Sequence, residues 1–184
     1  LERRKDLVRL LRQREADLVL THRPWDYHPD HRYAATLVQD AAFMVTVPHF
    51  CPEVPALRQN PVFLFMMDRF TVPQPFRADV AVAVDDVMDA KWALLDAMPS
   101  QVYEWLPWLE GRLPEVPTEE TARLAWLREA WSGFFRAPAE TAREALVRRY
   151  GEAHGRATEF AELFEVCQYG RQPAAEELAA LVPL

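Results

Sequence analysis

The sequence contains very little cysteine, and its two thiols stand far apart. Cys51 and Cys167 are the only cysteines among 184 residues, and neither belongs to a Cys-x-x-Cys pair. This scarcity argues against both a disulfide framework and a thiolate zinc site. We therefore expect two reduced, buried thiols in a cytoplasmic protein.

Clusters of positive charge and long apolar runs are also lacking. The 28 acidic side chains outnumber the 21 basic ones, for a formal net charge of -7. No lysine and arginine cluster could follow a phosphate backbone, so nucleic acid is not an expected partner. The longest apolar candidate, residues 62–67, has the length of a strand and falls short of the roughly 18 residues of a membrane span. No membrane span is therefore expected.

Half of the residues are hydrophobic, as in a folded globular protein. Strands are predicted at residues 17–21, 61–67 and 81–84, and an aromatic loop at 105–108. Helices are predicted at 2–14, from Pro29 to about Met44, after Asp85 or Asp86, from Thr118 to a boundary at Pro138, beyond Pro138 and near Glu176. This order predicts one α/β domain over residues 1–184, with a Rossmann-like, mostly parallel sheet, flanking helices and a helical C-terminal part.

The chain opens without an initiator methionine and enters an amphipathic helix directly. This opening favours a chain whose N-terminal β-α units are missing. Apolar surface that missing strands leave unmatched would promote association into homo-oligomers.

A polar loop between the first strand and the next helix holds the densest group of chemically active side chains. His28 and His31 stand three residues apart, with Asp30 between them and Pro29 at the first helical position. Both imidazoles can face the hollow at the carboxyl ends of parallel strands. Either the histidines bind a metal ion, with Asp30 as a ligand or as a partner of one ring, or Asp30 starts the helix and the histidines are polar surface residues.

The segment His28-Pro29-Asp30-His31-Arg32 resembles the second signature of the PIG-L or LmbE-like de-N-acetylases. Members of that family are zinc enzymes that hydrolyse N-acetyl groups from amino sugars and related conjugates. Weaker likeness extends along most of the chain, at Asp85, Lys91, Leu94, Ser100-Gln101, Gly155, Ala161-Glu162 and Phe164.

The resemblance implies Zn²⁺ as cofactor, a small-molecule N-acetylated sugar conjugate as substrate, and attack on the amide by a zinc-bound hydroxide. His31 would be the zinc ligand. His28 would be a charged imidazole that faces the developing oxyanion and gives a proton to the leaving amine. Asp30 would orient His28 and keep it protonated.

One part of the family pattern is absent. The first signature, His-Pro-Asp-Asp, supplies the other zinc ligands and the catalytic base in that family, and this sequence does not contain it. His22, His49 and His154 are isolated alternatives, and a catalytic zinc site needs about three protein ligands. The chain is therefore either a C-terminal portion of a longer enzyme or a diverged, non-catalytic relative that acts in assembly or ligand binding. A metal-dependent phosphoesterase is a third, weaker hypothesis.

Overall fold

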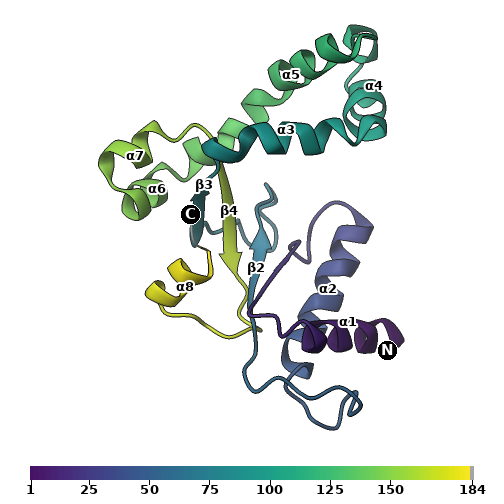
Figure 1. The fold of residues 1–184 in the computed structure, drawn as a ribbon, viewed down its shortest axis with the longest axis vertical. Helices are drawn as coiled ribbons and strands as arrows, with labels where there is room; N and C mark the ends of the chain where they lie inside the picture. The colour runs from purple at the N-terminus through teal and green to yellow at the C-terminus, as the bar shows by residue number, and fades with distance from the viewer. Residues whose placement is uncertain (183–184) are drawn as a thin grey trace. The chain divides into compact units, whose positions relative to one another are not determined.

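The computed structural model describes residues 1–182, and contacts divide them into two compact units. Unit 1 contains Leu1–Val82 and the segment from Leu163 onward, and unit 2 contains Ala83–Glu162. Figure 1 shows the elements of both units. The expectation that the whole chain behaves as one domain stays a prediction.

Unit 1 carries the strands and helices that surround the histidine motif. Its helices are α1 (Glu2–Gln13), α2 (Pro29–Met44) and α8 (Ala175–Leu181), and its complete strands are β1 (Leu18–Thr21) and β2 (Val62–Met66). The predicted strands at 17–21 and 61–67 and the predicted helices at 2–14 and from Pro29 are thereby confirmed. β1 and β2 pair in parallel, with Leu18 opposite Val62 and Thr21 opposite Phe65.

Two further strands, β3 (Val80–Ala83) and β4 (Ala161–Val166), complete a sheet with the order β1-β2-β4-β3. β4 runs antiparallel to β2. The Val84 N–H donates to the Phe160 carbonyl and the Val166 N–H donates to the Asp79 carboxylate, so β3 and β4 also run in opposite directions.

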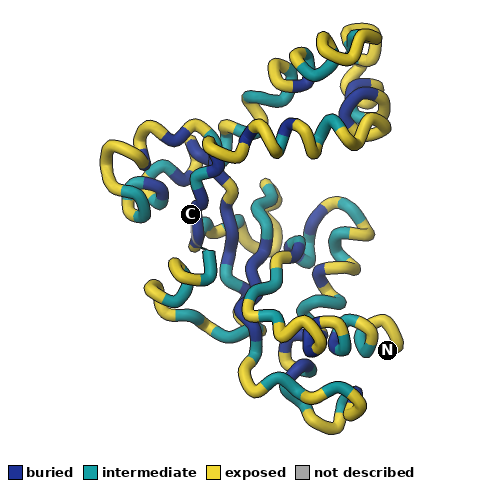
Figure 2. Tube along the Cα trace, in the orientation of Figure 1, coloured by how far each residue is buried: buried dark blue, intermediate teal, exposed yellow. Residues whose placement is uncertain are grey.

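The prediction of a mostly parallel sheet is therefore not confirmed, although the mixed α/β character is. The reason is β4, a strand that the sequence does not predict. The strand inserts between β2 and β3, so that only β1 and β2 keep the parallel pairing of a βαβ arrangement. β2, β3 and β4 are largely buried, whereas Leu20 of β1 is exposed (Figure 2).

The core of unit 1 lies where α1 and α2 cover the sheet. Phe63 and Phe65 of β2 pack there against apolar side chains of both helices. The other buried members are Val8, Leu11, Ala41, Ala42, Val45, Cys51 and Cys167. Both cysteines are free and buried, as predicted, and burial raises the pKa of the Cys167 thiol.

Unit 2 is helical, as predicted for the C-terminal part. Its helices are α3 (Met88–Asp96), α4 (Leu106–Leu109), α5 (Glu120–Thr141), α6 (Arg143–Tyr150) and α7 (Glu152–Ala157). Two predictions are wrong. α5 continues through the boundary that was expected at Pro138. Residues 105–108, expected to form an aromatic loop, are helical. Within residues 1–182, no helix combines the length and apolarity that crossing a bilayer requires.

Candidate functional site

The candidate site lies in unit 1, where β1 ends and α2 begins. His28 is the N-cap of α2, and its Nδ1 accepts a hydrogen bond from the Asp30 N–H at 3.2 Å. Pro29 occupies the first turn, where its missing N–H has no intrahelical partner to lose. The chain therefore enters the helix as the sequence predicts, and His31 projects from the first turn.

Asp26 holds the loop that carries both motif histidines. Its Oδ1 accepts the His28 backbone N–H at 2.9 Å and lies 3.0 Å from His31 Nδ1. The Arg32 guanidinium donates to the Asp26 carbonyl at 2.8 Å and to the Tyr27 carbonyl at 2.6 Å. The Asp26 side chain is only 11% exposed, so these hydrogen bonds operate in a partly dry environment where they gain strength.

His22 adjoins His31 from the end of β1. The two imidazole rings stack with their centroids 4.0 Å apart and their planes parallel to within 2°. Burial is the largest cause that lowers the pKa of His22, and the neighbouring His31 lowers this pKa further. Asp26 raises it in part. The His28 ring is also close, with its centroid 4.9 Å from that of His31.

His22, Asp26 and His31 could together hold a metal ion. Each offers one ligand atom, and these atoms all lie within 4.8 Å of one another. Imidazole nitrogen and carboxylate oxygen are donors that zinc accepts, so the chemistry of this set fits the ion that the family resemblance implies. A nitrogen lone pair lies in the plane of its ring, however, and nearly parallel planes do not meet at a shared ion. One of the two rings must rotate before both can bind the same ion.

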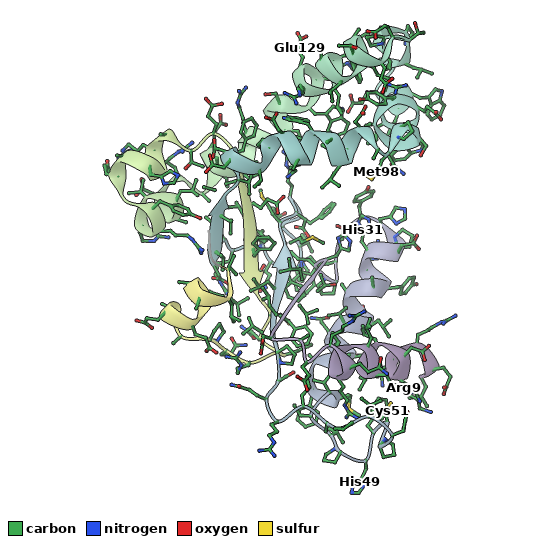
Figure 3. All side chains as sticks on the ribbon, in the orientation of Figure 1. Arg9, His31, His49, Cys51, Met98 and Glu129 are labelled. Carbon is green, nitrogen blue, oxygen red and sulfur yellow. The ribbon has the colours of Figure 1, made fainter. Side chains whose placement is uncertain are left out.

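The structure brings together some of the predicted site residues and leaves others apart. His31 lies in the metal-binding group and His28 lies beside it, whereas the Asp30 carboxylate is 88% exposed and 3.9 Å from His28 Nδ1. His49 lies beyond the other end of α2, far from His31 in Figure 3. His154 belongs to α7 of unit 2 and packs near Tyr150.

The loop that carries the histidines also contributes to a buried ion-pair network, which the sequence does not predict. The Arg23 guanidinium donates to Asp68 Oδ1 at 2.7 Å, and its Nε lies 3.3 Å from Glu165 Oε2 without hydrogen-bond geometry. Arg23 also donates to the carbonyls of Phe70 and Gln74. The segment after β2 is thereby anchored next to the loop.

No family model matches this sequence. Solved structures of other proteins share its fold. An N,N'-diacetylchitobiose deacetylase from Pyrococcus horikoshii, complexed with its inhibitor MPG, is 19% identical, with a TM-score of 0.57 over 91% of this chain and 52% of that one. The 4-carboxy-2-hydroxymuconate hydratase GalB from Pseudomonas putida is 18% identical, with a TM-score of 0.64 over 94% of this chain and 60% of the hydratase.

The conserved protein TT1542 from Thermus thermophilus is 20% identical, with a TM-score of 0.53 over 94% of this chain and 61% of TT1542. This chain thus spans between about half and three fifths of the length of these proteins. At such identities the likeness shows the fold alone. A deacetylase among the neighbours agrees, at the level of fold, with the family that the histidine motif resembles.

Proposed function

We propose that this chain carries part of the site of a zinc-dependent hydrolase that removes the N-acetyl group from an amino sugar or a related conjugate. The observation that carries the proposal is the convergence of His22, Asp26 and His31 at the end of β1. The deacetylase neighbour supports it, because its fold matches over 91% of this chain. A cytoplasmic location and homo-oligomeric association stay predictions.

The residues of the loop have distinct proposed roles around the metal. A bound Zn²⁺ supplies Lewis-acid activation of water for attack on the amide carbonyl. His31 is the proposed ligand from the motif, and His22 is the nearest second imidazole. These side chains must be neutral to bind a cation through nitrogen, and the lowered pKa of His22 favours that state.

His28 is the proposed acid of the site. Its Nδ1 accepts the Asp30 N–H in this structure, which leaves the ring proton on Nε2. To take a second proton on Nδ1, the ring must first give up the Asp30 N–H. The resulting cation would stabilise the developing oxyanion and pass its Nε2 proton to the leaving amine. The Asp30 carboxylate lies 3.9 Å from Nδ1, and its proposed role is to orient the ring.

Isothermal titration of the 184-residue chain with Zn²⁺ tests the metal assignment. We expect one bound equivalent in the wild type, a loss of most of that affinity in His31→Ala, and no change in the control His49→Ala, which removes an exposed imidazole elsewhere in unit 1. An unchanged affinity in His31→Ala would overturn the assignment. Release of acetate from an N-acetylglucosamine conjugate then tests the reaction, and His28→Ala should lower kcat by about 10²–10³-fold with the zinc affinity kept.

One observation favours the second candidate, a non-catalytic relative that acts in assembly or ligand binding. The nearly parallel rings of His22 and His31 do not point their lone pairs at a common ion. A non-catalytic chain would bind no zinc, release no acetate, and keep its melting temperature when His28 and His31 are both changed to alanine. The titration and the acetate assay therefore separate the two candidates.

A further inference from the structure

One oxygen atom of Asp26 links both histidines of the motif. Oδ1 accepts the backbone N–H of His28 and lies 3.0 Å from Nδ1 of His31. The backbone of Asp26 is held as well, because its N–H donates to the Arg23 carbonyl and its own carbonyl accepts from Arg32. The carboxylate is therefore fixed at the centre of the loop rather than free to move toward an ion.

The contact with Asp26 decides which nitrogen of His31 carries the proton. An ionised carboxylate can only accept hydrogen bonds, so at 3.0 Å the His31 Nδ1 must be the donor. A neutral imidazole with its proton on Nδ1 has its free lone pair on Nε2. In zinc sites, a ligating histidine commonly gives its other ring N–H to a carboxylate in this way, which fixes the ring and raises its basicity.

We infer that Asp26 is a positioning residue that presents His31 Nε2 to a metal ion, and that it is not itself a ligand of that ion. The inference rests on the proposed metal-binding role of His31. Nδ1 and Nε2 point away from each other around the five-membered ring, so an ion on Nε2 lies on the far side of the imidazole from Asp26. The His22 ring stacks on the face of the His31 ring and restricts the rotation of His31.

The tautomer of His31 tests this inference without any assay of activity. Long-range ¹H–¹⁵N correlation spectra of the histidine-labelled wild-type chain should show His31 protonated at Nδ1 and unprotonated at Nε2. Addition of Zn²⁺ alone should shift the Nε2 resonance of His31 most. A wild-type His31 protonated at Nε2, or a zinc-dependent shift centred on Nδ1, would overturn the inference, and neither result depends on a variant that folds.

Three variants complete the test. Asp26→Ala removes the acceptor, so His31 should lose its Nδ1–H tautomer and Zn²⁺ should bind about 10–100-fold more weakly. Asp26→Asn keeps a carbonyl acceptor and should retain the tautomer. Asp17→Ala, which removes an exposed carboxylate at the opposite end of β1, should change neither. An Asp26→Ala chain that keeps both the tautomer and the affinity would contradict the inference.

The outcomes also separate this inference from the proposed function. A wild-type chain with the Nδ1–H tautomer that binds no zinc would support the role of Asp26 in orienting the ring and would remove the zinc hydrolase. A chain that binds zinc through Nδ1 of His31, with Asp26 as a co-ligand, would keep the hydrolase and overturn the positioning role.

Discussion

His22 and His31 stack face to face, with ring centroids 4.0 Å apart and planes within 2° of parallel. The stack joins the end of β1 to the first turn of α2 and places two imidazoles in one small space. The same parallel arrangement keeps their in-plane lone pairs from converging. Zinc binding through both rings therefore requires His22 or His31 to rotate.

The stack gives a prediction about His22. His22→Phe keeps an aromatic ring against His31 but removes the nitrogen ligand, so zinc affinity should fall at least about tenfold while the melting temperature stays close to that of the wild type. Isothermal titration and thermal unfolding measure the two effects, with His49→Phe as the control for adding a phenyl ring. A wild-type affinity in His22→Phe would mean that His31 binds zinc without His22.

The parts of the fold that sequence predicted are those that local patterns specify. β1 and β2 are short apolar runs, and α2 begins at Pro29, a residue suited to the first helical turn. β4 gave no such signal, because Leu163 and Phe164 are adjacent and stand between two glutamates. One of those, Glu165, is buried with Arg23 against it, and this distant partner cannot be read from local sequence.

The residues of the candidate site also fall into those that a local pattern predicts and those that it does not. His28, Asp30 and His31 were found because they share a short motif. His22 and Asp26 join the metal-binding group through the turn of the loop, which local spacing does not specify. One signal was available for Asp26: an aspartate commonly accepts the backbone N–H two residues later, and Asp26 accepts from His28 in this way.

The buried guanidinium of Arg12 should be essential for the stability of unit 1. It donates to six backbone carbonyls, those of Met44, Val45, Val47, Phe50, Cys51 and Val54. Arg12→Met removes a donor from all six carbonyls, although those of Met44, Val45, Val47 and Cys51 also accept a backbone N–H. Since each hydrogen bond to a charged group contributes about 1.5–3 kcal/mol, the free energy of unfolding should fall by more than about 3 kcal/mol. Urea unfolding measures this. Arg3→Met, an exposed change in the same helix, should have almost no effect.

A second buried arginine, Arg23, gives a prediction in which two further substitutions should restore the stability that the first one removes. Arg23→Met removes the guanidinium that lies against the nearly unexposed carboxylates of Asp68 and Glu165, which should lower the free energy of unfolding by about 3–5 kcal/mol. Adding Asp68→Asn and Glu165→Gln removes the uncompensated charges and should restore much of the lost free energy of unfolding. Arg77→Met breaks a more exposed ion pair with Asp79 and should cost less than about 1 kcal/mol. A triple variant as unstable as Arg23→Met would contradict the electrostatic explanation.

The N-cap of α5 gives a prediction about pH. The Glu119 carboxylate accepts the N–H groups of Thr121 and Ala122, and these hydrogen bonds lower its pKa. A carboxyl group whose folded-state pKa is depressed stabilises the fold above its unfolded pKa and loses that contribution as the pH falls through the folded value. Glu119→Ala should therefore unfold at lower urea than the wild type at pH 7, and the two midpoints should converge as the pH falls below the ordinary glutamate range. Glu120→Ala, one position later, should show a smaller difference at pH 7, and a gap for Glu119→Ala that persists in acid would show that the carboxylate is not its cause.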